Sequence, residues 1–289
     1  MSQNITRIKK RINTISSTRK ITNSMKLVSS VKVRKLTKEF TRNKEFFDEL
    51  NSLFDNALYI DKFSSPEEIK NTPFVTPYSE AQGSLHVVIM SNLGLCGSYN
   101  AQIYRFLESI YKEGDEIIAI GNKAYSYIKG SCQIHTEFID LAHGLNIEKI
   151  GLLSEYLIRM YQSKKYKQVD CIYAKYINSL AFKPEIFKIL PLDIKERNDN
   201  LNYGPIYEVN KEDFINGFVP IYIKNVLLHL LYESCLCEET SRRNSMDNAN
   251  KNIDDLMYDL TIEYNKARQS SITSQITEIV GGAESIKNS

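Results

Sequence analysis

The sequence predicts a small α/β domain joined to a long antiparallel coiled coil that is built from the two ends of the chain. The first observation is where the helix-breaking residues fall. All seven prolines and ten of the twelve glycines lie between Pro66 and Pro220, whereas residues 1–65 and 221–280 contain neither type. Each end can therefore form one uninterrupted helix of about 60 residues.

The second observation is the spacing of apolar residues in the two end segments. In the first segment they recur every three or four positions, at Ile5, Ile8, Ile12 and Ile15, and the phase then shifts near Arg19. The last segment keeps a similar seam at Met246, Ala249, Ile253, Leu256, Leu260 and Ala267. Such long seams are typical of coiled coils, and the phase shift predicts a local change of supercoil. Because neither helix can bury its seam alone, we expect the two to pair antiparallel.

The middle of the chain has a different pattern. Apolar or β-branched runs predict strands at 85–90, 116–121, 134–141 and 169–176, and the stretches 99–112 and 147–162 predict helices. This alternation predicts a mostly parallel sheet with helical crossovers, as in a small Rossmann-like α/β domain. The predicted division is a coiled-coil helix at 1–65, the α/β domain at 66–211 and a second coiled-coil helix at 212–289.

Composition limits the compartment and the chemistry. No apolar run approaches the ~20 residues that span a bilayer, and the N-terminus does not resemble a signal peptide. We therefore expect a soluble or peripheral protein on the cytoplasmic side. The five cysteines are irregularly spaced, which favours reduced thiols, and Cys235 and Cys237 have no second pair to complete a zinc site. No metal and no cofactor are expected.

The segment SNLGLCGSYN at 91–100 is the strongest candidate for a small-molecule site. It follows a predicted strand and precedes a predicted helix, where α/β folds bind phosphates. Gly94 and Gly97 lack the third glycine of a dinucleotide motif, so a plain glycine turn is favoured over a nucleotide enzyme. Cys96 stands where a nucleophile could sit, but no partnering base is identifiable. The sequence therefore predicts no catalytic constellation.

The charge is strongly asymmetric. Residues 1–44 hold 13 Lys and Arg and one acid, a net +12, which leaves −10 for the rest because the whole chain is +2. Three interpretations are open: a mitochondrial transit peptide, a nucleic-acid-binding coiled coil, or a basic shaft that faces acidic protein loops. The seam that continues past residue 40 and the lack of early aromatic residues disfavour the first two.

Three motifs, in order, resemble the γ subunit of F-type ATP synthases. Residues 5–36, ITRIKKRINTISSTRKITNSMKLVSSVKVRKL, resemble the family's N-terminal signature. GLCG at 94–97, with Asn100, is similar to its G-L-C-G-x-x-N. Residues 245–283 resemble its C-terminal block, with M-D-N-A, Y-N-x-x-R-Q-x-x-I-T and T-E-I-V-x-G-A. The motifs cover nearly the whole length, so the chain is identified as a member of this H⁺- or Na⁺-transporting family.

The resemblance implies a central rotor shaft. Its terminal helices would form a coiled coil inside a ring of three α and three β subunits, and its α/β domain would contact the ε subunit and the c-subunit ring. Ion flow would turn the c ring and the shaft, which drives the β sites through ATP synthesis or hydrolysis. Catalysis belongs to β, so we expect a non-catalytic subunit. It would be peripheral to a bacterial plasma membrane through the c ring, on the cytoplasmic face, with no nucleic acid as partner.

The resemblance also implies contacts with the α/β ring. Met25 and Arg242 match family positions near the acidic lever loops of β, and Arg268 and Gln269 match a pair that meets its catch loops. Two further matches, farther toward the tip, are Thr273 and Glu278. The basic first segment adds three more expected contacts, Lys9, Lys10 and Lys20.

Several positions depart from the family pattern. Asn92 and Leu93 replace the usual D-R before GLCG, and Thr240 and Ser241 replace alanines. Pro220 falls where the family's long helix already runs, which predicts a helix start or a kink there. These changes predict altered packing more than altered mechanism.

The end of the last helix has an unusual composition. Residues 267–282, ARQSSITSQITEIVGG, have helical spacing but mostly Ser, Thr, Gln and Ala in place of leucines. Such a surface predicts a tip that adheres weakly and can turn past its partners.

Overall fold

The computed structural model describes residues 2–57, 74–75, 78, 81, 83–192 and 211–287. Contacts divide the chain into two compact units, Met1–Ser29 with Arg243–Ser289, and Ser30–Arg242. We call them the coil unit and the body unit and describe each by itself. Among the described residues, no helix combines the length and the apolar character needed to cross a bilayer.

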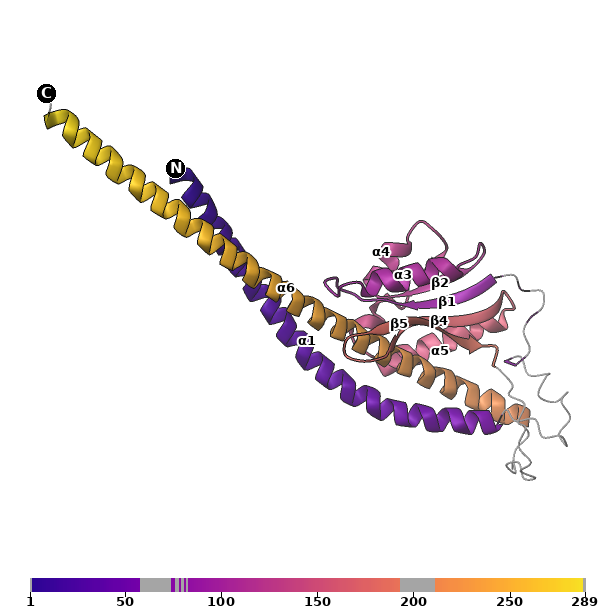
Figure 1. The fold of residues 1–289 in the computed structure, drawn as a ribbon. Helices are drawn as coiled ribbons and strands as arrows, with labels where there is room; N and C mark the ends of the chain where they lie inside the picture. Colours follow the sequence, from indigo (N-terminus) through magenta and orange to yellow (C-terminus); the bar gives the residue numbers. More distant parts are fainter. Residues whose placement is uncertain are drawn as a thin grey trace. The chain divides into compact units, whose positions relative to one another are not determined.

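Two long helices form the N-terminal and C-terminal segments that the structure describes. Helix α1 spans Ser2–Ala57 and helix α6 spans Lys211–Lys287 (Figure 1). The predicted boundary between residues 65 and 66 lies outside the described residues. Pro220 lies inside α6, which excludes the helix start that the sequence allowed at this position. The Pro220 carbonyl instead accepts a hydrogen bond from Ser154 Oγ at 3.2 Å.

A five-stranded sheet forms the centre of the body unit, in the order β3-β2-β1-β4-β5. The strands are β1 Gly83–Ile89, β2 Glu116–Ile120, β3 Ile134–His135, β4 Tyr166–Tyr176 and β5 Phe182–Leu190. The pairs β1–β2, β1–β4 and β2–β3 are parallel, and β4–β5 is antiparallel. The predicted mostly parallel sheet is confirmed, with one antiparallel strand added at its edge.

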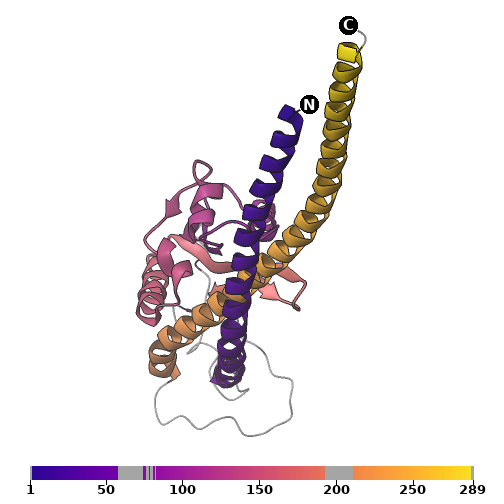
Figure 2. The ribbon, with the colours of Figure 1, turned by 90° about the vertical axis from the view of Figure 1, so that its left-hand side faces the viewer.

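Helices cover both faces of this sheet. They are α3 Tyr99–Ile110, α4 Asn122–Ile128 and α5 Ile147–Gln162, with a short 3-10 helix, η1, at Ile139–His143. Alternate residues of β1 divide between two cores, since Val87 packs with α5 and the first part of α6, whereas Val88 packs with α3 and α4. Figures 1 and 2 show α3 and α4 on one face and α5 on the other.

The predicted elements were partly wrong at the edges of the sheet. The run at 134–141 is a strand only over Ile134–His135, because the chain turns at Thr136 and continues into η1. Strand β5 was missed because it contains three charged residues, Lys183, Glu185 and Lys188, together with Pro184. An edge strand tolerates such residues, since one side of its backbone needs no partner.

Candidate functional site: the paired helices and the glycine-rich turn

In the coil unit, α1 and α6 pair antiparallel through polar contacts. Arg19 Nε lies 2.8 Å from Asp254 Oδ1, and Lys26 Nζ lies 2.6 Å from Asp247 Oδ1. Between them, the Thr22 hydroxyl bonds to the Asn250 side chain. The numbers of paired residues sum to 272 or 273 in each case, so the register is constant across this stretch.

The last part of α6 extends beyond this pairing. At a constant register the residue opposite Ser2 is near 271, so residues 272–287 have no described residue of α1 opposite them. Figures 1 and 2 both show the end of α6 continuing past the start of α1. At about 1.5 Å per residue, this tip is roughly 24 Å long.

The tip carries more apolar surface than its composition suggested. Its apolar side chains are exposed by 46%, 56%, 72% and 53% at Ile272, Ile276, Ile279 and Val280. These positions share one side of a helix. An exposed apolar stripe therefore runs beside the hydroxylated side chains, and the weak adhesion of the tip stays a prediction.

Most residues predicted to contact partners lie on the surface of the coil unit. Met25 is half-buried, and the remaining predicted contacts of this unit are exposed: Lys9, Lys10, Lys20, Arg268, Gln269, Thr273 and Glu278. The structure therefore leaves all of them available to another molecule.

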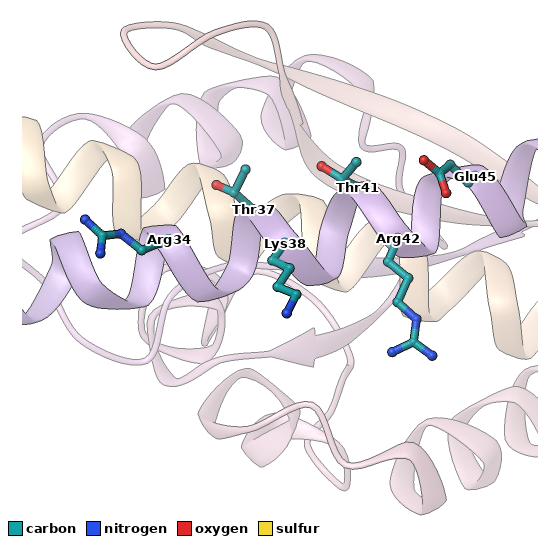
Figure 3. A pocket seen from close by; sticks show the side chains of 6 residues that line it. All are labelled: Arg34, Thr37, Lys38, Thr41, Arg42 and Glu45. Atoms are coloured by element: carbon teal, nitrogen blue, oxygen red, sulfur yellow. The ribbon is translucent and has the colours of Figure 1, made fainter.

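The part of α1 in the body unit is also basic. Arg34, Lys38 and Arg42 are exposed there, and a shallow surface runs over them and over Thr37, Thr41 and Glu45. Figure 3 shows Lys38 and Arg42 extending to the same side of α1.

Some of the N-terminal cations are neutralised within the chain. Arg19 and Lys26 pair with acids of α6 in the coil unit, and Lys32 Nζ lies 2.8 Å from Glu239 Oε1 in the body unit. Sequence reasoning attributed the whole +12 to external partners and missed these pairs. The sequence contained a signal for these pairs. For each of these cations, an acid of the last segment stands near the position that an antiparallel pairing of nearly constant register places opposite it.

Arg242 is the centre of a buried polar network in the body unit. It is only 5% exposed, and its guanidinium lies 2.6 Å from Glu238 Oε1 and 2.9 Å from Glu239 Oε1. It also donates to the carbonyls of Leu93 at 3.1 Å and Gly94 at 3.3 Å. Burial raises the pKa of Glu238, and the nearby Arg242 opposes that rise. The side chain therefore fixes the glycine-rich turn to α6.

The glycine-rich turn is held together by its own side chains. Leu95 and Gly97 have positive φ angles of 63° and 60°. Asn100 Oδ1 accepts from the backbone N–H of Ser91 at 3.1 Å, and Asn100 Nδ2 donates to Cys96 Sγ at 3.2 Å. These bonds explain why an asparagine follows the GLCG sequence at this spacing.

A second side chain of α6 binds the turn. Ser241 Oγ donates to the carbonyl of Cys96 at 2.7 Å. The Ser241 departure therefore adds a hydrogen bond, and the preferred interpretation of residues 91–100 as a structural turn agrees with this docking.

The thiols of the body unit are poor candidates for nucleophiles. Burial raises the pKa of Cys96, and burial raises the pKa of Cys235 to about 12. Both thiols therefore stay protonated at neutral pH, whereas a nucleophilic cysteine reacts as its thiolate. Within the described ranges, no group of three or more His, Cys, Asp or Glu side chains is arranged to hold a metal ion.

Comparisons with known proteins agree with this architecture. A family model described as ATP synthase matches residues 4–286. The ATP synthase gamma chain of Malacoplasma penetrans is 38% identical over 287 residues, covering 96% of this chain and 97% of that one. The gamma chain of Mesoplasma florum is 33% identical over 285 residues, covering 98% and 99%.

Solved structures show the same fold. The rotor of the Euglena gracilis mitochondrial ATP synthase has a TM-score of 0.68 at 16% identity, covering 94% of this chain and 100% of that chain. A second structure, of the same enzyme's OSCP/F1/c-ring assembly, gives 0.69 at 19% identity, covering 99% and 95%. With a matching family model and relatives above 30% identity over nearly its whole length, the chain belongs to the ATP synthase gamma chain family.

Proposed function

We propose that this chain is the central rotor shaft of a rotary ATP synthase. It couples ion flow through the membrane sector to ATP synthesis or hydrolysis on the β subunits. Its partners are three α and three β subunits, the ε subunit and the c-subunit ring. The proposal rests on family membership and on one structural observation, the unpaired tip of α6.

The tip supports the proposal because proteins that act as monomers rarely expose a continuous apolar surface of this kind. Four exposed branched aliphatic residues, between 272 and 280, share one side of a helix that no described residue of α1 covers. An exposed apolar stripe with polar neighbours marks an interaction site. A ring of subunits that encloses the tip would cover the stripe at every angle of rotation.

The predicted contact residues fit the same arrangement. The exposed cations Lys9, Lys10 and Lys20 offer long-range attraction to acidic loops without a fixed, desolvated fit. Arg268 and Gln269 can make and break polar contacts near the tip. We assign Met25, Thr273 and Glu278 to the same contact surface.

Arg242 has a different role in this proposal. Its guanidinium holds the glycine-rich turn, so it acts as a positioning residue within the body unit. Within the body unit this network joins α6 to the glycine-rich turn, and the half-exposed Lys32 links α1 to it through Glu239, which supports a body that turns as one piece.

The chemistry of the complex belongs to other subunits. We propose that this chain has no catalytic residues of its own and that it is attached to the cytoplasmic face of a bacterial plasma membrane through the c ring. Buried, protonated thiols and the structural role of the glycine-rich turn support a non-catalytic subunit.

The decisive experiment is to purify the tagged full chain from its own cells. We expect α and β subunits to remain bound after nuclease treatment, with ATPase activity in the assembly and none in the isolated chain. A bead attached to the body of the chain should rotate when the immobilised α and β ring hydrolyses ATP. Loss of all partners after nuclease treatment would instead favour a nucleic-acid-binding protein, and turnover by the isolated chain would favour an enzyme.

A further inference from the structure

A connected group of polar side chains lies between the sheet and α5 in the body unit. Glu116 is the first residue of β2, and His135 is on the neighbouring strand β3. His135 pairs with Ile118, which shares a sheet face with Glu116 because side chains alternate along a strand. Ile118 belongs to the core that α5 covers, and Tyr156 of α5 packs against the same core. The two strands and the helix therefore bring Glu116, His135 and Tyr156 together.

A chain of hydrogen bonds connects these three side chains. His135 Nε2 lies 2.8 Å from Glu116 Oε2, and His135 Nδ1 lies 3.0 Å from the Tyr156 hydroxyl oxygen. The Glu116 carboxylate also accepts from Lys165 Nζ and from the Tyr166 hydroxyl. The chain thus has a phenol at one end and a carboxylate with several donors at the other.

The partners of each group determine where the protons lie. Burial acts to raise the pKa of Glu116, but hydrogen bonds from three neighbouring side chains outweigh burial, so the pKa lies below its usual value. Glu116 is therefore ionised at neutral pH and can only accept hydrogen bonds. In a neutral imidazole one nitrogen donates and the other accepts. Nε2 of His135 must then carry the proton, which leaves the lone pair of Nδ1 for the Tyr156 O–H.

This geometry favours the oxidation of Tyr156 by one electron. A phenol that loses an electron becomes strongly acidic, so its oxidation is easier when a base takes the proton in the same step. Nδ1 of His135 is within hydrogen-bond reach to act as that base, and Glu116 stabilises the imidazolium that forms. Arg159 Cζ lies 5.5 Å from the centroid of the Tyr156 ring, and this cation disfavours a positive charge on the ring. The proton should therefore leave with the electron.

Two other ionisable groups lie near this chain of hydrogen bonds. Burial raises the pKa of Tyr156, and the charge of Glu137 adds to the rise. Burial also raises the pKa of Cys132, and the charge of Glu116 adds to that rise. The phenol and the thiol both keep their protons at neutral pH, so Tyr156 meets an oxidant as a hydrogen-bonded phenol and not as a phenolate.

The Tyr156 ring is half-buried. The ring of Phe138 packs against it with centroids 5.4 Å apart, and the imidazole of His135 meets it edge-on at 6.0 Å. An oxidant that takes an electron through the ring does not need to reach the hydroxyl, which His135 covers. The same packing keeps a radical on Tyr156 from coupling with a radical on another chain.

We propose that Tyr156 is a redox-active tyrosine that reacts with one-electron oxidants, such as organic radicals or high-valent metal complexes. One electron passes to the oxidant, and the phenol O–H bond breaks. The proton binds to Nδ1 of His135, which becomes an imidazolium ion beside Glu116, and Tyr156 becomes a neutral phenoxyl radical. This site lies within the body unit, and the proposal does not depend on rotation.

The test uses the full-length chain, with photochemically generated tris(bipyridine)ruthenium(III) as the oxidant. Freeze-quenched samples are examined by electron paramagnetic resonance for a tyrosyl radical. We expect Tyr156→Phe to remove most of the signal. Tyr258→Phe is the control, since it removes a tyrosine that is 68% exposed, and it should leave the signal unchanged. The absence of a tyrosyl signal, or an equal loss in the two variants, would overturn the proposal.

A further variant tests the role of His135. His135→Gln keeps a donor for Glu116 and an acceptor for the Tyr156 hydroxyl, but an amide oxygen does not take the proton. The rate of radical formation should fall at least about tenfold, because a positioned base contributes roughly 10²–10⁴-fold to a proton transfer. An unchanged rate would show that the histidine has only a structural role and would overturn the proposal.

Two measurements on the unaltered chain do not depend on how the variants fold. Radical formation should be slower in D₂O than in H₂O, because the phenol proton moves together with the electron. It should also slow at acidic pH, where His135 carries a proton on both nitrogens and no longer accepts from Tyr156. Equal rates in the two solvents, or equal rates at neutral and acidic pH, would contradict a proton transfer to His135 and overturn the proposal.

Discussion

The imidazole of His229 on α6 stacks on the ring of Phe47 on α1, with centroids 4.1 Å apart and an interplanar angle of 2°. Phe40 lies two turns before Phe47 on α1, 5.4 Å from the same imidazole, and Asn43 Oδ1 lies 3.0 Å from Nδ1. One buried histidine therefore joins α1 to α6 within the body unit.

This contact predicts that acid weakens the fold. Burial lowers the pKa of His229 from 6.5 to about 4, and Lys44 adds to this while Asp48 opposes it. Above pH 6.5 the imidazole is neutral whether the chain is folded or unfolded. As the pH falls from 6.5 to 4, the unfolded chain binds a proton that the folded chain does not, so stability is lost. We expect a loss of up to about 3 kcal/mol across this window.

Chemical denaturation at several pH values measures this effect, and His229→Phe is the matched variant. It keeps an aromatic ring beside Phe47 and removes the titrating group, so the slope between pH 6.5 and 4 should flatten. An equal slope in both proteins would assign the acid sensitivity to other groups.

Removing Arg242 should destabilise the body unit strongly. Arg242→Met leaves the carboxylates of Glu238 and Glu239 buried without their main counter-charge, and such a loss costs about 3–5 kcal/mol. Urea unfolding at pH 7 measures the change. Because burial raises the pKa of Glu238, acid should protonate it in the variant and restore part of the stability.

A triple variant separates charge from packing at this site. Arg242→Met combined with Glu238→Gln and Glu239→Gln removes all three charges, and it should recover most of the stability that Arg242→Met loses. If the triple variant is no more stable than the single one, the hydrogen bonds to the glycine-rich turn are the dominant contribution.

The sequence predicted the architecture well because its main signals are local. The absence of Gly and Pro at both ends marks two long helices, and apolar runs such as 85–90 mark buried parallel strands. Strand β5 was not predictable in this way, because pairing with β4 stabilises it despite Pro184.

The site was predicted less completely, because a contact between residues far apart in sequence determines part of it. The exposed Arg268 was assigned by its match to a motif, and that assignment stays a prediction. Glu238 and Glu239 lie four and three residues before Arg242 on the same helix, but its bond to the carbonyl of Leu93 joins segments far apart in the chain, and charge counting does not reveal it.

Replacing Thr240 should stabilise the chain. Thr240 is 5% exposed, and its hydroxyl has no hydrogen-bond partner within the part of the chain that the structure describes. Thr240→Val keeps the shape and removes the unsatisfied group, so the free energy of unfolding should rise by about 1 kcal/mol. Ser241→Ala is the contrasting control, since it removes a hydroxyl that donates to Cys96 and should lower stability. A lower stability of Thr240→Val would show that the hydroxyl has a partner in solution.

Met25→Lys should impair coupling without unfolding the chain. Met25 is half-buried on a basic helix, so an added cation would strengthen attraction to an acidic loop of β and hold the shaft at one angle. Ion pumping per ATP hydrolysed, measured in membrane vesicles with the assembled complex, should fall. Met25→Gln adds a polar group of similar size without charge and should pump normally. An unchanged pumping ratio in Met25→Lys would contradict the electrostatic explanation.

The tip of α6 separates stability from assembly. Ile276 and Ile279 are 56% and 72% exposed, so replacing both with Ser removes few contacts within the chain, and its stability should change by less than about 0.5 kcal/mol. In the complex the same change removes apolar surface that the α and β ring would cover, so we expect weaker assembly or altered rotation rates. Leu180→Ser, on an exposed hairpin of the body unit, is the matched control and should affect neither property. Normal assembly and an unaltered rotation rate in the double Ser variant would show that the apolar stripe is not the surface on which the tip turns.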